Sequence, residues 1–281
     1  MELSVIILSY TITDGLFEMT SNCINSLLES ETAIDVEVIL VESNKNYFNS
    51  GFLYPEFVKV IVPDSDFNFH KFLNIGIKES KGELVALCNN DLIFYKNWFT
   101  QILKVSKKAP MIKSFSPSGK IGDFGFTEEF ELGYKVRTHV LGWCLVVYKE
   151  VLEKLGYLDE AFNFGYADND YAMTLKKFNI KHALVNSSKV EHLEREKSKE
   201  NRKGLSEGYK NLHDRVNLNL DKLPDYVLKK GNEYLLEDKQ VLDDYIKYHN
   251  KWGAPVLLHR KNKIVDLLIQ YNLGFLNRLI L

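Results

Sequence analysis

Residues 84–91 have the sequence LVALCNND, in which an apolar run gives way abruptly to three polar residues. A short run without charges, such as residues 84–88, is typical of a strand enclosed in a parallel sheet. Asn89-Asn90-Asp91 would then follow the carboxyl end of that strand. Because ligands of open α/β sheets bind just beyond the carboxyl ends of the strands, the triplet indicates a binding site.

Strand-like runs and helical patterns alternate on the N-terminal side of this stretch. Residues 3–8, 36–41 and 58–62 have the apolar, β-branched composition of strands. After the first and third of these runs, apolar residues recur at helical spacing, at Leu16, Met19, Cys23, Leu27 and Leu28 and at Phe69, Phe72, Leu73 and Ile77. This alternation predicts a parallel sheet whose strands are joined by crossover helices.

The pattern is less regular on the C-terminal side. Residues 116–134 are rich in Gly, Ser and Phe, which predicts a loop with a short hairpin lying over the sheet like a lid. Beyond this loop we expect strands at residues 140–148 and 182–185 and helices at residues 150–155 and 168–178.

The composition changes near residue 198, where charged, helical patterns replace β-branched runs. We therefore predict an α/β domain over residues 1–197 and a helical C-terminal region over residues 198–281, which would supply acceptor, lid or oligomer contacts. Residues 264–281 are apolar with basic residues nearby. They predict packing on the core or in a homodimer, with peripheral contact to a membrane surface as the alternative.

Charge and composition argue against several classes of protein. Lys and Arg total 36 against 38 for Asp and Glu, so the net charge of −2 provides no overall field to attract nucleic acid. No apolar run approaches the roughly 20 residues that span a bilayer. No basic segment precedes the first strand, so we expect no secretory signal and a cytoplasmic location. Cys23, Cys88 and Cys144 lack the spacing of a zinc site or a disulfide framework, which predicts buried, reduced side chains.

Asn89-Asn90-Asp91 offers one carboxylate and two amide oxygens. Such ligands suit a hard divalent cation that takes its other ligands from water and phosphate. His192 follows a strand-like run at residues 188–190, and its neutral imidazole could ligate the same metal. The alternative for the triplet alone is a polar turn, since Asn and Asp side chains bond their own backbone in turns.

Two further carboxylates open the helix expected at residues 168–178. Asp168 and Asp170 follow an aromatic segment containing glycine, residues 162–166, which has the composition of a pocket wall. The alternative is purely electrostatic, because acidic residues in a first turn oppose the helix dipole by roughly 0.3–1 kcal/mol. Helix capping alone does not require the aromatic wall.

Other short motifs complete an order along the chain. Leu8-Ser9-Tyr10-Thr11 ends the first strand, Val41-Glu42-Ser43 ends the second, and Asn74-Ile75-Gly76 precedes the polar triplet. Downstream the chain has Gly142-Trp143-Cys144, Gly156-Tyr157-Leu158-Asp159, Asp168-Asn169-Asp170 and Val190-Glu191-His192. In this order, from residue 3 to about residue 195, the motifs resemble those of glycosyltransferase family 2.

The resemblance implies a GT-A type, Rossmann-like fold, in which a mixed, mostly parallel sheet is flanked by helices and carries the helical C-terminal region. It implies inverting, metal-dependent transfer of a hexosyl or pentosyl group from a nucleotide-diphosphate donor, expected to be a UDP-sugar. The acceptor would be a hydroxyl group of a saccharide or glycoconjugate. Asp91 and His192 would hold a Mg or Mn ion that neutralises the leaving diphosphate, and Asp168 would be the general base.

The resemblance also implies binding roles. The residues expected at the nucleotide sugar are Ser9, Tyr10, Thr11, Glu42, Asn68, Lys71, Asn74, Asn89, Asn90 and Asp91. Those expected on the acceptor side are Trp143, Tyr166 and Asp170. For Lys71, a solvated position on a helix face is the alternative to a contact with the diphosphate.

Two departures from the family pattern leave alternatives open. Ala167 stands where the family usually has Glu, and Asn89 stands where many members have Asp. One alternative is therefore a module that binds nucleotide sugars without turnover, although Asp91 and Asp168 are both retained. Another is transfer to a hydroxymethylated base in DNA, which would need base extrusion and a cationic groove. The overall charge argues mildly against this second alternative.

Overall fold

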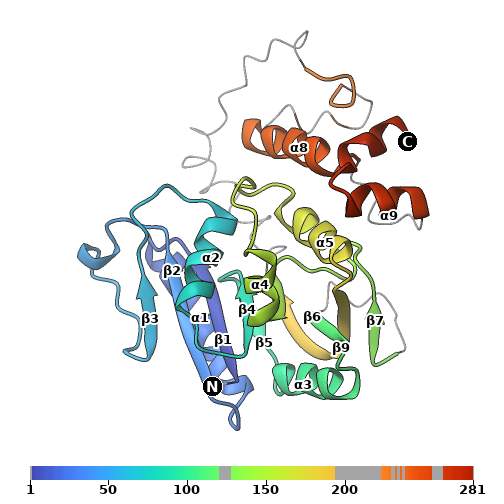
Figure 1. Ribbon diagram of the computed structural model, residues 1–281. Helices are drawn as coiled ribbons and strands as arrows, with labels where there is room; N and C mark the ends of the chain where they lie inside the picture. The colour runs from blue at the N-terminus through green and yellow to red at the C-terminus, as the bar shows by residue number, and fades with distance from the viewer. Residues whose placement is uncertain are drawn as a thin grey trace.

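A mixed sheet with helices on both faces forms the centre of the protein (Figure 1). The computed structural model describes residues 2–119, 128–193, 223–228, 232, 235, 238–254 and 262–280. Within these ranges the sheet has nine strands in the order β3-β2-β1-β4-β8-β6-β9-β5, and β7 pairs with β9. The predicted α/β fold class is thus confirmed.

The first four predicted strands form the parallel half of the sheet. They are β1 (Leu3–Ser9), β2 (Val36–Glu42), β3 (Val58–Ile61) and β4 (Leu84–Cys88), and each agrees with its predicted range to within one residue. Every residue of β1 and β4 is buried. Apolar residues dominate both strands because both faces of the sheet are covered.

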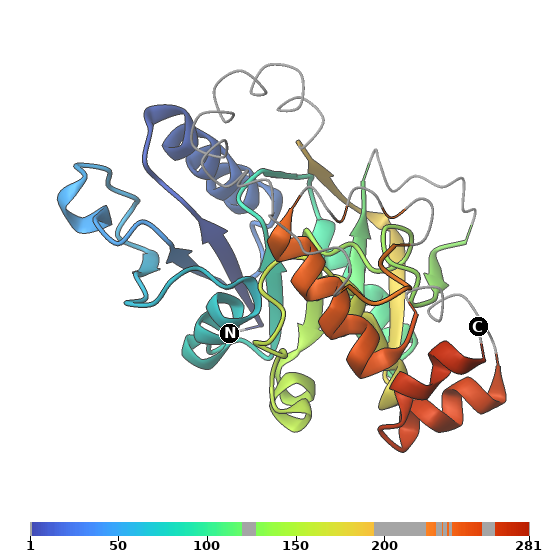
Figure 2. The same ribbon diagram turned by 90° about the horizontal axis from the view of Figure 1, so that it is seen from above.

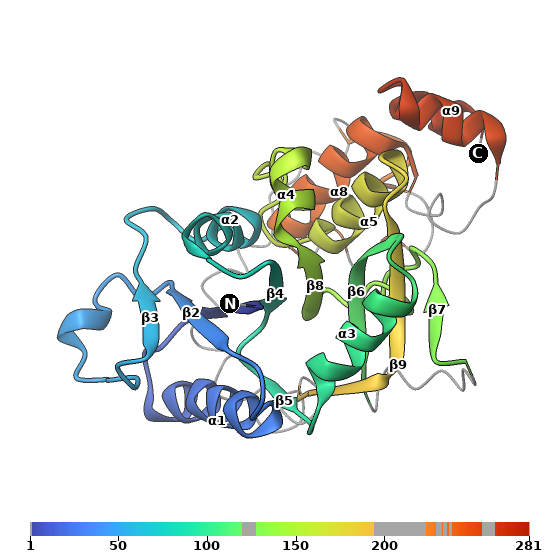
Figure 3. The same ribbon diagram turned by 60° about the horizontal axis from the view of Figure 1, so that its bottom comes forward.

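Two helices cover opposite faces of this half, α1 (Asp14–Ser30) and α2 (Phe69–Glu79) (Figure 3). Successive side chains of a strand point to opposite faces. Val5 and Ile7 of β1 accordingly join the apolar cluster that contains residues of α1, whereas Ile6 joins the cluster that contains residues of α2.

The other half of the sheet contains antiparallel pairs. Strand β8 (Cys144–Tyr148) is antiparallel to both β4 and β6 (Ile112–Ser118), and β9 (Lys181–His192) is parallel to β6. Two short strands, β5 (Leu92–Phe94) and β7 (Phe130–Leu132), pair antiparallel with β9.

Two predicted strands have different bounds in the structure. The strand expected at residues 140–148 begins only at Cys144, because the Cys144 N–H donates to the Leu141 carbonyl at 3.0 Å and closes a turn. The strand expected at residues 182–185 is the centre of the longer β9.

Two regions contain strands or helices that the sequence patterns do not predict. Residues 92–115, for which the patterns predict no element, form β5, helix α3 (Trp98–Lys108) and the start of β6. The loop and hairpin expected at residues 116–134 include the end of β6 and all of β7. The predicted lid lies partly outside the described residues, at 120–127.

Helices α4 (Lys149–Leu155) and α5 (Ala167–Lys177) lie on the same face as α2, within one residue of their predicted ranges (Figure 3). The described C-terminal residues form α8 (Lys239–Trp252), α9 (Lys263–Gln270) and a 3-10 helix, η5 (Gly274–Leu279). Helices α8 and α9 lie on the face of the sheet opposite α1 (Figure 2). The boundary predicted near residue 198 falls outside the described residues.

The apolar C-terminal end packs on the core through one face of α9. Val265 and Ile269 are buried in the same cluster as residues of α2 and α5, whereas Ile264, Leu267 and Tyr271 are exposed. No helix among the described residues is long and apolar enough to cross a membrane. Cys23, Cys88 and Cys144 are free and buried, as predicted.

Gly76 sets how closely α2 approaches β1, and Gly76→Ala tests this contact. An added Cβ would lie 2.4 Å from Ile6 Cγ2. Overpacking of a core costs about 1–3 kcal/mol, which exceeds the helix-propensity gain of up to about 1 kcal/mol from replacing Gly by Ala. Urea unfolding should therefore show a less stable Gly76→Ala protein.

Gly15→Ala in α1 is the matched control, because a Cβ at Gly15 would meet no atom within 4 Å. We expect this variant to be as stable as the wild type or more stable. A Gly76→Ala protein that is equally stabilised would contradict the close contact between α2 and β1.

Candidate active site

The carboxyl ends of β1, β2 and β4 carry polar residues that the sequence singles out. Ser9 of β1 pairs in register with Glu42 of β2, and Ile7 of β1 pairs with Cys88, the residue before Asn89. Because the three strands are adjacent and parallel, the loops that follow them meet at one edge of the sheet.

Glu42, which is fully buried, supports the turn after β1. Its carboxylate accepts hydrogen bonds from Ser9 Oγ at 2.6 Å, from the Thr11 N–H at 3.0 Å and from the Asn44 N–H at 2.7 Å. Asn44 Nδ2 in turn donates to the Thr11 carbonyl at 2.7 Å. Ser9, Thr11 and Glu42, which are expected at the nucleotide sugar, are thus linked by hydrogen bonds. Tyr10, which is expected there too, is 52% exposed.

An aromatic cluster that the sequence analysis does not single out flanks this turn. The Tyr54 hydroxyl lies 2.8 Å from Thr11 Oγ1. The Phe17 ring stacks on Phe52 with centroids 5.2 Å apart, and its centroid lies 5.0 Å from that of Tyr54. The only sequence signal for this cluster is the aromatic density of residues 47–57.

The predicted metal ligands lie side by side. His192 Nε2 is 3.3 Å from Asp91 Oδ1, and each side chain is 9% exposed. Their proximity follows from the sheet, because His192 of β9 pairs in register with Leu92, the first residue of β5. Asn89 also reaches this pair, with Nδ2 3.5 Å from His192 Nε2, and the Trp143 ring stacks on the imidazole at 5.7 Å.

The Asp91–His192 pair fits a divalent metal. Bonds of about 2.1 Å in an octahedral ion place neighbouring ligand atoms about 3 Å apart, close to the observed separation. Among the described residues, no group of three or more His, Cys, Asp or Glu side chains gathers that could hold a metal ion. Two protein ligands suit an ion that takes its other ligands from a diphosphate.

Asn90, the middle residue of the triplet, has a different partner. Its Nδ2 donates to Thr20 Oγ1 at 2.9 Å.

Asp168 reaches the same region from the first turn of α5. A Cβ atom on Gly142 would lie 2.9 Å from Asp168 Cβ and 3.2 Å from its Oδ2, so the two residues touch and glycine alone leaves room. Gly142 precedes Trp143, whose carbonyl accepts the Asn89 N–H at 3.0 Å. Residues 142 and 143 therefore join the predicted base to the predicted metal ligands.

Burial raises the pKa of Asp168 above its ordinary value. Loss of contact with water is the largest cause. The Asn169 N–H, which donates to Asp168 Oδ1 at 2.9 Å, and the positive charge of Arg137 oppose the shift without cancelling it. A carboxylate with a raised pKa is better matched to proton abstraction near neutral pH.

The chain matches the sequence pattern of a known protein family. A family model described as glycosyl transferase family 2 matches residues 4–155, more than half of the 281 residues. The chain belongs to glycosyltransferase family 2. No curated protein sequence matches this chain.

Two solved structures are similar to this chain. GalNAc-T7, crystallised with UDP, GalNAc and Mn²⁺, matches with a TM-score of 0.53 and 13% identity over 68% of this chain and 43% of its own. S. aureus TarS 1-349 in complex with UDP-GlcNAc matches with a TM-score of 0.51 and 14% identity over 68% and 58%. The chain spans about half the length of these structures, and the likeness confirms the GT-A fold.

Asn68, Lys71 and Asn74, which are expected at the nucleotide sugar, lie on or just before α2, and the side chains of the two asparagines have other partners. Asn68 caps the helix, since its Oδ1 accepts the Lys71 N–H at 2.8 Å, while its Nδ2 donates to the Glu160 carbonyl at 2.9 Å. Buried Asn74 bonds both the N–H and the carbonyl of Leu158, at 3.0 and 2.9 Å. These contacts hold residues 158–160 and do not link α2 to Asp91.

Asp170 contacts α8. It is 2% exposed, its Oδ1 accepts the Trp252 Nε1–H at 2.6 Å, and Lys251 Nζ lies 2.7 Å away. Residues two apart on a helix point about 200° apart, so Asp168 and Asp170 serve different neighbours. Of the other residues expected on the acceptor side, Trp143 adjoins Asp168 through Gly142, whereas Tyr166 packs on Tyr245 and Tyr248 of α8.

Asp168→Asn should stabilise the protein at neutral pH. Because the pKa of Asp168 is raised in the folded state, the ionised carboxylate opposes folding, and the wild type loses stability as pH rises through the unfolded and then the folded pKa. The Asn side chain can still accept the Asn169 N–H. Urea unfolding should show a gain at pH 7 that shrinks as pH falls towards the ordinary carboxylate pKa of about 3.9.

The control is Asp243→Asn, because the Asp243 side chain is 46% exposed and pairs with Lys239 across one turn of α8. Its effect should stay within about 0.5 kcal/mol at either pH. An Asp168→Asn protein no more stable than the wild type at pH 7 would contradict the raised pKa.

Proposed function

We propose that this glycosyltransferase transfers a sugar, with inversion, from a UDP-sugar to a hydroxyl group of a saccharide or glycoconjugate. The observation that carries the proposal is the bridge formed by two adjacent residues. Gly142 touches Asp168, and Trp143 stacks on His192 beside Asp91. A general base and a metal-binding pair therefore border the same small region.

The donor side is formed by the metal-binding pair and the turn after β1. Asp91 and His192 would hold a Mn or Mg ion, which supplies several kcal/mol of charge stabilisation to a departing diphosphate. The turn of Ser9 and Thr11, fixed by Glu42, borders the rings of the aromatic cluster. Flat apolar faces beside polar turn groups suit a nucleoside. The UDP and UDP-GlcNAc of the two similar structures support this choice of donor.

On the acceptor side, Asp168 would take the proton of the attacking hydroxyl group. Its raised pKa favours this role, since a base acts best when its pKa is near the working pH. Ala167 is buried and fills the position of the usual family Glu with an apolar group, so Asp168 would act without a neighbouring carboxylate there. Attack on the face opposite the diphosphate gives inversion at the anomeric carbon.

Residues 1–197 would form the donor-binding and catalytic unit, and residues 198–281 would contribute contacts on the acceptor side. The packing of Tyr166, which precedes Asp168, on Tyr245 and Tyr248 of α8 supports this division of roles.

Asp91→Ala tests the donor site. In a thermal-shift screen of UDP-sugars with and without Mn²⁺, the wild type should show a metal-dependent rise in Tm, because a ligand that binds only the folded state stabilises it. The Asp91→Ala protein should lose this metal dependence, because one of the two protein ligands is gone. The same Mn²⁺-dependent shift in both proteins would rule out Asp91 as a metal ligand.

Asp168→Asn tests the base. The variant should keep the metal-dependent donor shift and lose transfer by about 100-fold to 10,000-fold, the usual contribution of a general base. The wild-type kcat/KM should fall on the acid side at a pH above the ordinary carboxylate value of about 3.9, because burial raises the pKa of Asp168. Transfer near the wild-type rate would remove Asp168 as the base, and donor binding without transfer by the wild type would favour the non-catalytic module.

A further inference from the structure

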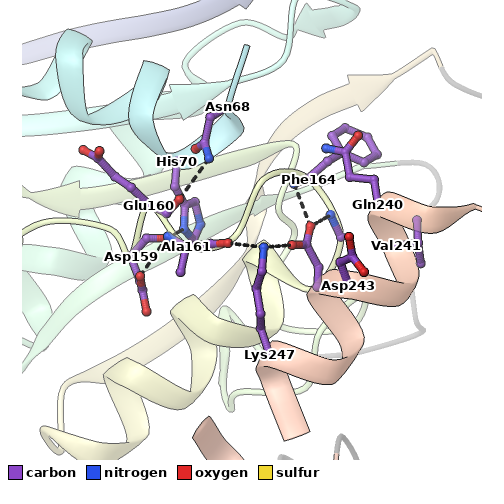
Figure 4. A network of polar contacts seen from close by, with 12 residues as sticks. Asn68, His70, Asp159, Glu160, Ala161, Phe164, Gln240, Val241, Asp243 and Lys247 are labelled. Carbon is purple, nitrogen blue, oxygen red and sulfur yellow. Dashed lines mark hydrogen bonds and ion pairs between the residues drawn. The ribbon is translucent and has the colours of Figure 1, made fainter. Parts of the chain in front are cut away.

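The segment of residues 159–170, which carries Asp168 in the first turn of α5, lies between two helices from distant parts of the chain (Figure 4). Helix α2 holds one side of it. Asn68 Nδ2 donates to the Glu160 carbonyl at 2.9 Å, and His70 Nδ1 lies 2.7 Å from the Asp159 carbonyl. The backbone N–H at the first residue of α2 also donates to the carbonyl of residue 163 at 2.7 Å.

Asp244 of α8 holds the other side of the segment. Its side chain is fully buried, and its Oδ2 accepts the Phe164 N–H at 3.1 Å and the Gly165 N–H at 3.0 Å. Lys247 Nζ lies 3.0 Å from Asp244 Oδ1 and also donates to the Ala161 carbonyl at 2.8 Å. A buried carboxylate is tolerated when it is both paired and hydrogen-bonded, and Asp244 meets both conditions.

The contact with Asp244 lies three and four residues before Asp168. A Cβ atom on Gly165 would lie 3.3 Å from Val241 Cα, so glycine lets the helix backbone approach closely. The next residue, Tyr166, has a left-handed conformation with φ 57°, and α5 begins directly after it. The direction in which α5 starts, and hence the position of Asp168, follows from where Phe164 and Gly165 are held.

The end of α8 makes a second contact with the same segment. Lys251 Nζ lies 2.6 Å from Asp159 Oδ2 and 2.7 Å from Asp170 Oδ1. Trp252 Nε1 donates to the same oxygen of Asp170 at 2.6 Å. Helix α8 thus contacts the two ends of the segment through Lys251 and its centre through Asp244.

From these contacts we infer that α8 positions the catalytic base, with Asp244 as the main positioning residue and Lys251 as the second. This inference rests on the proposed function of Asp168. Asp244 accepts hydrogen bonds from the backbone of the segment, and through that backbone it holds Asp168 against Gly142. The C-terminal region is thereby part of the reaction centre, although the donor-side residues Asp91 and His192 come from the sheet.

Asp244→Asn tests the inference, with Asp243→Asn as the matched control on the same helix. The kcat of Asp244→Asn should fall by about 10-fold to 100-fold, since misplacing a catalytic group by 1 Å can cost 10²-fold. The KM for the UDP-sugar should stay within about twofold, because an interaction made only in the transition state is lost. Asp243→Asn should match the wild type, since Asp243 is exposed and pairs with Lys239.

Hydrogen exchange of the Phe164 and Gly165 amides gives a readout that needs no substrate. Both amides donate to Asp244, so their exchange should be at least about tenfold faster in Asp244→Asn than in Asp243→Asn. A wild-type protein without transfer activity would refute the proposed function, while the exchange rates would still decide whether Asp244 holds the segment.

A wild-type kcat in Asp244→Asn, an equal loss in Asp243→Asn, or unchanged exchange of both amides would overturn the inference. If Asp244→Asn does not fold, Lys247→Met takes its place, because the Lys247 side chain is 44% exposed and its removal leaves Asp244 without its cation. Lower kcat and faster exchange are again expected, and wild-type values of both would overturn the inference.

Discussion

The contact between Gly142 and Asp168 is the constraint on which the proposed reaction centre depends. Gly142 lies in the turn before β8, and β8 pairs antiparallel with β4 so that Cys144 lies opposite Cys88. This register places Trp143 beside the polar triplet that follows β4. With any side chain at residue 142, either the turn or the start of α5 would have to shift, and the contact with Asp168 would change.

The antiparallel strand β8 therefore brings residues to this edge of the sheet that a purely parallel sheet would not bring there. A parallel sheet gathers the turns after β1, β2 and β4 at one edge, which supplies the donor side. The start of β8 and the end of β9 arrive at the same edge, and they add Trp143 and His192. Helices α2 and α8 then fix the segment that carries Asp168, so residues from nearly the whole chain contribute to one site.

The sequence predicts the parallel half of the fold well and the other half poorly, for physical reasons. Doubly covered strands are continuous apolar runs, and an amphipathic helix has a clear period. Strand β5 has only three residues, and β9 includes polar residues at 186–188 that interrupt its apolar pattern. Helix α3 did carry a signal, since buried Trp98 and Ile102 lie one turn apart.

For the proposed site, the sequence singles out residues on strand ends and on the first turn of α5. Sheet register brings Asp91 and His192 together, and the contact of Asp168 with Gly142 adds the first turn of α5. Asn74 and Asp170 bind partners more than 80 residues away, on elements whose packing a one-dimensional pattern does not contain. The same holds for Asp244, whose role depends on a helix beyond the predicted domain.

The central claim is that Asp91, His192 and Asp168 border one reaction centre. A crystal structure of the protein with Mn²⁺ and UDP, with the metal located by its anomalous signal, tests this claim most directly. The account predicts a Mn²⁺ ion bonded to Asp91, His192 and the diphosphate, with the Asp168 carboxylate against Gly142 and facing the space beyond the terminal phosphate. Mn²⁺ and UDP bound without Asp91 and His192, or an Asp168 carboxylate outside that space, would contradict it.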